Sequence, residues 1–399
     1  MIPHFSSEAS VTSVSRITIN PMRPALLTAL LATTLTLAQS PRRVTDEMVR
    51  EVQRTAILVD THNDVTSFTV GGFDIAKPGS AHHTDIPRLR AGGVGAVFFA
   101  AYVDSKYAKD HTAEHRVLDM IDTVRTDIIA ANPTTFSFAT SAAEIEAAHR
   151  QGKIAALIGI EGGHAIEDDP RALRDFYALG VRYMTLTHTN SNDWADSSGD
   201  IDDRTVKHHG GLTDLGRQIV AEMNRLGMMV DISHVADKTF YDVIAASTAP
   251  PIASHSSCRA LANVPRNMTD DMIVALAKKG GVIQINFNCG FLSQKSADEY
   301  SAQLKRGIKG TARKEFPATL EDVVNHIEHV IKIAGIGAVG IGSDFDGVTC
   351  TPVGLEDVSK FPALTRALLE KGYSPDDIRK IYGGNTLRLM RAVEHARQI

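Results

Sequence analysis

Histidine and carboxylate residues recur in this chain directly after short apolar segments. His62 and Asp64 are two residues apart, and because side chains alternate along an extended backbone, both point to the same side and can hold one cation. Five more residues of metal-ligand or acid–base type follow other apolar segments: Glu161, His188, His234, His255 and Asp344. One such residue alone means little, since the spacing also occurs at His83-x-Asp85 in a polar loop. What gives the seven residues weight is that they share one kind of position.

The apolar segments predict eight β-strands. They are short, rich in β-branched residues and bounded by turns, and they lie at Ala56–Thr61, Val94–Val103, Ile154–Ile160, Arg182–Thr187, Met228–Ser233, Pro251–Ser254, Val282–Phe287 and Ala338–Ser343. Helical patterns lie between most of them, including Glu114–Ala131, Asp214–Arg225, Thr269–Lys279 and Thr319–Ala334. Eightfold alternation predicts a (β/α)8 TIM-like barrel, in which the seven residues converge at one mouth.

A doubly wound α/β sheet is the alternative fold. It requires a phosphate-binding glycine loop after the first strand, where this chain has His62-Asn63-Asp64. The dinucleotide-like pattern Gly335-x-Gly337-x-x-Gly340 precedes its strand instead of following one, which argues against a doubly wound sheet.

His326 and His329, spaced three apart on a helix, are predicted to be polar surface residues. The loop Asn190–Gly211, which contains His208-His209, is predicted to be either solvated or a lid.

Composition narrows the class of protein. The chain has 399 residues, of which 43% are hydrophobic and 22% charged, enough to bury a large core. A net charge of −5 without a long basic run argues against nucleic acid as a partner. Three cysteines, Cys258, Cys289 and Cys350, are too few for a thiolate zinc site or a disulfide scaffold. A pair between Cys258 and Cys289 stays open for an oxidising compartment.

The first forty residues are predicted to be a secretory signal peptide. The apolar run Pro24–Ala38 follows Arg23 and ends in the small-x-small pattern Ala38-Gln39-Ser40. A start at Met22 would give a compact signal, and the alternative is an uncleaved anchor helix. Residues 45–399 are then a single catalytic domain, secreted or periplasmic. The charged C-terminal segment is unlike a lipid-anchor signal, so no stable membrane anchor is expected after cleavage.

The motifs around these residues resemble a known family. They are DTHND at 60–64, TDIPRLRAGGVGA at 84–96, GIEGGHAI at 159–166, LTHTNSNDWADS at 186–197, VDISHVA at 230–236, ASHSS with NVPRNMTDD at 253–271, and GIGSDFDGV at 340–348. Together they resemble the renal (membrane) dipeptidase family of zinc hydrolases, from about residue 45 to GGNTLRLM at 383–390. The chain departs from the animal enzymes in lacking a lipid-anchor tail and from many bacterial relatives in having Cys258 after SHSS, but neither departure touches a matched site residue.

The resemblance implies a binuclear zinc site and assigns its residues. Five residues match the ligand positions: His62, Asp64, Glu161, His234 and His255. Glu161 falls where the family has the carboxylate that bridges the two ions. The resemblance also implies that His188 polarises the substrate, that Asp344 is the acid–base group and that Arg266 binds the substrate carboxylate.

Charge then suggests the chemistry. Two Zn²⁺ ions bring four positive charges, of which Asp64 and Glu161 offset two, so the site favours a bridging hydroxide at neutral pH. This hydroxide would attack the scissile amide, while Asp344 moves the proton to the leaving amine. The expected substrates are small dipeptides. Hydrolysis of L-D as well as L-L dipeptides, and a homodimer, both stay open.

Two other functional classes remain at this point. One is another metal-dependent amidohydrolase, of the deacetylase, dihydropyrimidinase-like or lactonase type, but most of these use an HxH pair and often a modified lysine, and neither is visible here. The other is a non-catalytic binding protein on the same fold. A binding protein of that kind would be indicated by a different residue at Asp344 or at one of the five ligand positions, and all six positions have the residue that the family requires.

Overall fold

The computed structural model describes residues 43–79, 81–308, 314 and 316–398, and within them a parallel β-barrel. The predicted signal segment 1–40, with Met22, lies outside the described residues. Nine strands are present: β1 (Leu58–Asn63), β2 (Val94–Tyr102), β3 (Phe136–Phe138), β4 (Ile154–Glu161), β5 (Val181–Thr185), β6 (Met229–Asp231), β7 (Ile252–Ser256), β8 (Val282–Ile285) and β9 (Val339–Ile341). Eight of them close the ring in the order β1-β2-β4-β5-β6-β7-β8-β9, with every pairing parallel. The predicted (β/α)8 barrel is therefore confirmed.

The strand β3 is the one that the sequence pattern missed. It is three residues long and pairs with the first half of β4, at Ile154–Ala156, while β5 pairs with the second half of β4 from Ile158 onward. The other edge of β4 pairs with β2. Three residues are too few to produce a recognisable alternation, so a short strand of this kind leaves almost no signal in the sequence.

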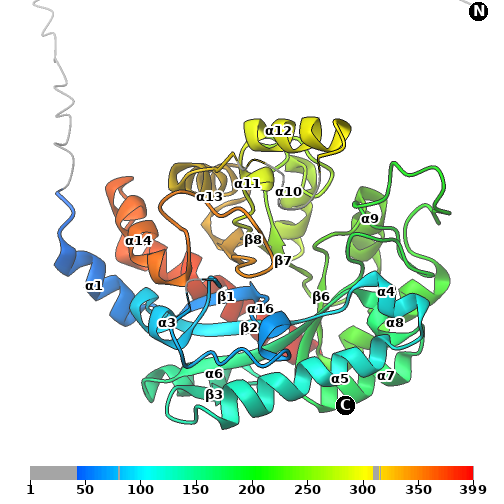
Figure 1. Ribbon diagram of the computed structural model, residues 1–399, viewed down its shortest axis with the longest axis horizontal. Helices are drawn as coiled ribbons and strands as arrows, with labels where there is room; N and C mark the ends of the chain where they lie inside the picture. Colours follow the sequence, from blue (N-terminus) through cyan, green and yellow to red (C-terminus); the bar gives the residue numbers. More distant parts are fainter. Residues whose placement is uncertain (1–42, 80, 309–313, 315, 399) are drawn as a thin grey trace, which may run out of the picture. The chain divides into compact units, whose positions relative to one another are not determined.

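Helices surround the barrel (Figure 1). They are α1 (Asp46–Thr55), α2 (Thr66–Thr69), α3 (Ile86–Gly92), α4 (Ser105–Lys109), α5 (Ala113–Thr123), α6 (Ala142–Arg150), α7 (Pro170–Ala178), α8 (Asp214–Leu226), α9 (Asp237–Ala246), α10 (Asp270–Lys278), α11 (Cys289–Leu292), α12 (Gln294–Lys305), α13 (Leu320–Ala334), α14 (Phe361–Glu370), α15 (Pro375–Arg379) and α16 (Asn385–Ala396). The helix predicted at Glu114–Ala131 is α5 followed by a π-helical stretch, Val124–Ala130. The predicted helices at 214–225 and 319–334 differ from α8 and α13 by one residue at one end, and the one at 269–279 is longer than α10 by one residue at each end.

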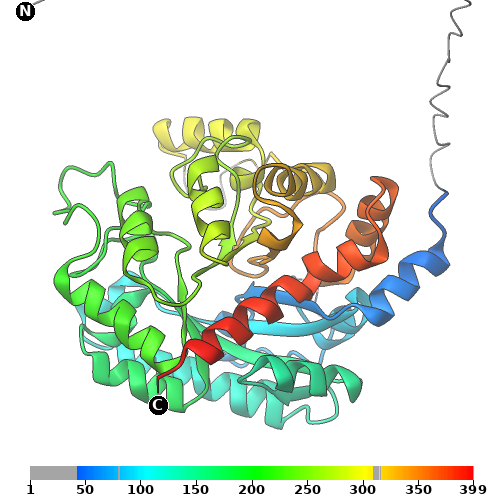
Figure 2. The same ribbon diagram turned by 180° about the vertical axis from the view of Figure 1, so that it is seen from behind.

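The barrel interior is apolar at the end opposite the carboxyl ends of the strands. Val59, Phe98 and Leu157 are fully buried there and pack in one cluster with Leu389 and Val393 of α16. Figure 2, which shows the molecule from behind, has α16 (red) running across in front of the strands. Because this end is filled by side chains, the polar residues of the strands are left for the other end. None of the helices in the described part of the chain has the length and apolar composition that crossing a bilayer requires.

The prediction that His326 lies at the surface is wrong. Its side chain on α13 is fully buried. The ring Nδ1 accepts a hydrogen bond from the Cys258 amide at 3.0 Å, and Nε2 donates to the Leu292 carbonyl at 3.0 Å. His329, one turn further on, is half-buried and pairs with Asp270 at 2.7 Å. The spacing of residues on a helix does not tell which face of the helix is buried. Here α11 and the segment after β7 cover the face of α13 that carries His326.

A disulfide joins Cys289 to Cys350, with Cα atoms 5.6 Å apart. The pair between Cys258 and Cys289 that the sequence left open is therefore not formed. Cys258 is buried and is the free cysteine of the described chain. The bond ties the start of α11, which follows β8, to the segment after β9, so it cross-links two loops at the mouth of the barrel.

Candidate metal centre

The seven residues singled out in the sequence come together at the carboxyl ends of the strands. Three of them lie within strands: His62 in β1, Glu161 at the end of β4 and His255 in β7. The other four follow a strand by one to three residues: Asp64 after β1, His188 after β5, His234 after β6 and Asp344 after β9. All but His188 are buried, and the His188 side chain is 16% exposed.

Glu161 is at the centre of the cluster. Its Oε1 lies 3.0 Å from His234 Nε2 and 3.2 Å from His255 Nε2, and its Oε2 lies 3.5 Å from His62 Nε2. On the Oε2 side, His62 Nε2 is in turn 3.3 Å from Asp64 Oδ2. The two carboxylate oxygens therefore face two different sets of donors, one with His62 and Asp64 and one with His234 and His255.

Neighbouring side chains fix two of these imidazoles. His62 Nδ1 lies 2.7 Å from the Tyr183 hydroxyl, and His255 Nδ1 lies 2.7 Å from the Ser254 hydroxyl, which donates to Asp231 Oδ2 at 2.5 Å. In both cases Nε2 is left to face Glu161. Tyr183 reaches His62 because its ring lies over Gly159, where an added Cβ would stand 2.0 Å from the ring. Contacts of this kind hold metal-binding histidines in one orientation and tautomer.

The donor set fits metal ions. His62 Nε2 and Asp64 Oδ2 are buried and have no hydrogen-bond partner among the described residues, although buried polar atoms almost always have one. His234 Nε2 and His255 Nε2 face each other at 2.9 Å, and burial keeps the pKa of each histidine well below its usual value, so both are neutral. Neutral imidazoles and carboxylates without thiolate are a donor set that suits zinc.

Asp344 approaches the cluster from β9. Its backbone has φ of +62°, and His234 has +67°, in the left-handed region that side-chain-bearing residues rarely adopt and that is often found at functional sites. Asn286 donates to Asp344 Oδ2 at 2.8 Å. An added Cβ at Gly347 would stand 2.4 Å from both Asp344 Oδ1 and Asp64 Oδ2, so the chain crosses the two carboxylates there with no room for a side chain. Burial, together with the Asp64 charge, raises the pKa of Asp344 well above its usual value.

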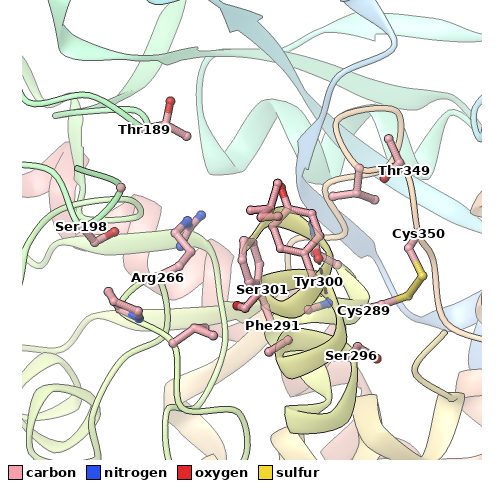
Figure 3. A pocket seen from close by; sticks show the side chains of 18 of the residues that line it. Thr189, Ser198, Arg266, Cys289, Phe291, Ser296, Tyr300, Ser301, Thr349 and Cys350 are labelled. Carbon is pink, nitrogen blue, oxygen red and sulfur yellow. Dashed lines mark hydrogen bonds between the residues drawn. A yellow bond between two sulfur atoms is a disulfide. The ribbon is translucent and has the colours of Figure 1, made fainter. Parts of the chain in front are cut away.

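Arg266 lies beside the cluster in a cavity of about 820 Å³ that His234 also lines. Its Nη1 donates to Ser256 Oγ at 2.8 Å and its Nη2 to the His255 carbonyl at 2.6 Å, whereas its buried Nε has no partner within the described chain. It neither caps the helix at Thr269 nor pairs with Asp270, which binds His329. The guanidinium is thus held against the strand that carries His255 (Figure 3).

The segment 190–211 follows His188 and is bonded mainly to itself. Asp196 accepts from the amides of His209 and Gly211 at 2.8 Å each, and Asp200 accepts from the Ser191 amide and hydroxyl. Its base, including Trp194, is buried, and its tip is exposed near Ile201. The tip lines the same cavity as Arg266 through Asp200, Asp202 and Asp203. The segment is thus an ordered wall of the cavity with a solvated tip. Its closing as a lid stays a prediction.

Fold and site together define a metal-dependent hydrolase. Residues 46–399 match the family model of the membrane dipeptidases (peptidase family M19), and the chain belongs to that family. It is 40% identical to dipeptidase verJ of Clonostachys rogersoniana over 353 residues, 84% of each chain. It is therefore a metallopeptidase that acts on dipeptides, as the motifs implied, rather than another amidohydrolase or a binding protein.

Two solved structures are similar along nearly their whole length. The probable dipeptidase PvdM from Pseudomonas aeruginosa has a TM-score of 0.78 at 26% identity, covering 88% of this chain and 98% of its own. A metallopeptidase from Rhodobacter sphaeroides has a TM-score of 0.73 at 29% identity, covering 85% of this chain and 99% of its own. That protein was solved with a phosphinate mimic of the dipeptide L-Ala-D-Ala.

Sequence reasoning missed the residues that support the site. Asn286 holds Asp344, Tyr183 holds His62, and Ser254 with Asp231 holds His255. Asp231 and Ser254 carried a usable signal, because each is a polar residue in a buried strand close to a proposed ligand: Asp231 is three residues before His234, and Ser254 directly precedes His255. Tyr183 and Asn286 carried none, since their partners are distant in the sequence.

Proposed function

We propose that this chain hydrolyses the amide bond of dipeptides with two zinc ions, held by His62, Asp64, Glu161, His234 and His255 and bridged by Glu161. The observation that carries the proposal is the position of Glu161, whose two oxygens face separate sets of buried donors. A zinc pair supplies, when bound, a hydroxide at neutral pH and a positive field for the carbonyl oxygen.

The remaining residues have separate tasks in this proposal. Asp344 accepts the proton of the attacking water and returns it to the leaving amine, and Asn286 holds its carboxylate in place. His188, whose Nε2 lies 3.7 Å from Glu161 Oε1, stabilises the charge that develops on the carbonyl oxygen. Arg266 holds the C-terminal carboxylate of the substrate through a bidentate contact and so positions the scissile carbonyl.

The proposal includes the stereochemistry that is accepted. The cavity beside Arg266 is wide, and the Rhodobacter sphaeroides structure holds a mimic of an L-D dipeptide, so L-D as well as L-L dipeptides are proposed substrates. We also propose export of the chain to an extracellular or periplasmic space. The disulfide between Cys289 and Cys350 supports this, because such bonds persist in oxidising compartments.

The experiment is metal analysis of the purified protein together with a hydrolysis screen on L-L and L-D dipeptides. The expected result is about two zinc ions per chain, hydrolysis of dipeptides and loss of activity on chelation. His255→Ala should lower the zinc content by one ion and remove most turnover, whereas His395→Ala, at an exposed position on α16, should change neither. Full activity of metal-free protein would refute the proposal.

A further inference from the structure

The cavity beside Arg266 extends well beyond the metal centre, to α11 and α12. At about 820 Å³ it is near the upper end of the range for small-molecule sites, and a dipeptide of small residues fills only part of it. Figure 3 shows Arg266 among the lining residues with Phe291 of α11 and Tyr300 of α12, and with the disulfide between Cys289 and Cys350 at its edge. The additional space can therefore hold a larger part of a substrate.

One face of α12 forms a mainly apolar wall of this cavity, and the polar Ser296 and Gln303 of the same helix also line it. Ala297, Tyr300, Ser301 and Leu304 all line it, and their spacing of three and four residues puts them on the same side of the helix. Tyr300 is 47% exposed and Leu304 is 41% exposed, and both are among the large hydrophobic residues that the described chain leaves accessible. An apolar surface inside a cavity next to a reaction centre is typical of a binding site rather than of a solvent-facing helix.

The wall is held firmly in place. Gln303, nearly buried on the same helix, donates to the Lys314 carbonyl at 2.8 Å and accepts from the Lys314 amide at 2.7 Å. The Ser296 hydroxyl bonds the Phe316 carbonyl, and the disulfide fixes the start of α11. A side chain that packs against Tyr300 and Leu304 therefore meets a surface that is already ordered, which lowers the entropy cost of binding.

The position of Arg266 indicates which part of the substrate faces this wall. This step rests on the proposed function, in which Arg266 binds the C-terminal carboxylate. The α-carbon of the C-terminal residue is one bond from that carboxylate, so its side chain starts next to the guanidinium. The Phe291 ring centre lies 5.4 Å from the Arg266 guanidinium carbon, and Tyr300 and Leu304 line the same cavity.

We propose that Tyr300 and Leu304 of α12 are specificity-determining residues that bind an aromatic or long aliphatic side chain on the C-terminal residue of the dipeptide. Acidic side chains of similar length fit less well, because three carboxylates, Asp200, Asp202 and Asp203, line the cavity against a single lysine, Lys314. Removing an aromatic side chain from water against this wall should raise kcat/KM by ~10-fold or more over a residue without a side chain.

The test compares kcat/KM for Ala-Phe and Ala-Glu, each with the C-terminal residue in the L and in the D form, and for Ala-Gly, whose C-terminal residue is achiral. For the wild-type protein, the ratio of Ala-Phe to Ala-Gly in the preferred stereochemical series should be ~10 or more, and Ala-Glu should fall below Ala-Phe. Leu304→Asp and Tyr300→Ala should each lower the Ala-Phe to Ala-Gly ratio, Leu304→Asp by up to ~10-fold. The matched control is Tyr241→Ala, at an equally exposed tyrosine (42%) on α9 outside the cavity lining, which should keep the wild-type ratio.

The outcomes separate this inference from the function on which it rests. If the wild-type protein hydrolyses Ala-Gly but shows a ratio near one, or if neither variant on α12 changes the ratio, the inference is wrong and the dipeptidase proposal stands. If the wild-type protein hydrolyses none of the dipeptides, the proposed function fails and the inference fails with it. The ratio is measured within each variant, so a partial loss of folded protein cancels.

Discussion

The metal centre and the cavity wall lie side by side at the barrel mouth but are built differently. Each proposed metal ligand is inside a strand or at most three residues beyond one, and the buried ladder of parallel strands fixes its position. The wall is one face of α12, and it is held by Gln303 and Ser296 and, through the start of α11, by the disulfide. The comparison suggests that the strands carry the chemistry, while the loops and added helices determine which dipeptide is bound.

The largest expected effect is at Asp344, on the side of the metal centre. Asp344→Asn keeps the shape of the side chain and removes its basicity, so kcat should fall by ~10²-fold or more. Zinc content, measured on the same sample, should stay at the wild-type level, because the ligand set does not include Asp344. Asp119→Asn, at a partly exposed carboxylate on α5, serves as the control and should leave both values unchanged.

A loss of zinc in Asp344→Asn, with normal turnover in the fraction that keeps its metal, would contradict this assignment. Asp344 would then be a metal ligand, and the group of His62, Asp64 and Asp344, whose ligand atoms lie within 4.8 Å of one another, would be the ion site that it serves.

The second prediction concerns Arg266, which stands between the two regions. Amidation of the dipeptide C-terminus should lower kcat/KM by one to several powers of ten, since a charge-assisted bidentate contact is lost. Arg266→Ala should cause a similar loss with the free acid and almost none with the amide, because both changes delete the same contact. Losses that add independently in this double cycle would show that Arg266 does not hold the carboxylate.

How much of this could be predicted from the sequence differs between the two regions. The barrel and the position of His62, Glu161 and His255 follow from short-range patterns, since a polar residue at the end of an apolar strand stays at the strand end after folding. The disulfide between Cys289 and Cys350 spans 61 residues, and nothing in the local pattern distinguishes it from a pair with Cys258. The wall on α12 depends in the same way on contacts between distant segments, so it was not predicted.

The third prediction tests whether the wall can be loosened without affecting the metal centre. Cys350→Ser should lower the free energy of unfolding by about 2–4 kcal/mol, the usual range for a disulfide that closes a loop of this size. A reducing agent should have a comparable effect on the wild-type protein and little on the variant, measured by denaturant unfolding, and zinc content should be unchanged. Cys258→Ser, at the free buried cysteine, should keep the full response to the reducing agent.

An unfolding curve of the wild-type protein that does not respond to the reducing agent would contradict the third prediction. A drop in zinc content after Cys350→Ser would show instead that the two regions are coupled, since the segment of Cys350 also carries Gly347 over Asp64 and Asp344.

The smallest expected effect concerns His326, which connects the two regions. Its imidazole bonds the Cys258 amide, three residues after His255, and the Leu292 carbonyl at the end of α11. Burial lowers the pKa of His326 to about 4, from an ordinary value of 6.5. The unfolded state therefore binds this proton more tightly than the folded state does. Stability from this group is complete at pH 7 and decreases as the pH falls from about 6.5 towards 4.

The measurement is the free energy of unfolding at pH 7 and pH 5 for the wild-type protein and His326→Gln. Because glutamine does not titrate, the wild-type protein should lose about 2 kcal/mol more than the variant between the two pH values. The histidines proposed as metal ligands and the carboxylates are the same in both proteins, so their contributions cancel in the difference. Equal losses in the two proteins would show that His326 takes up its proton as easily in the folded chain as in the unfolded one. In that case its two hydrogen bonds do not hold it neutral, and the contact between the segment after β7 and α11 is more open to water than its burial indicates.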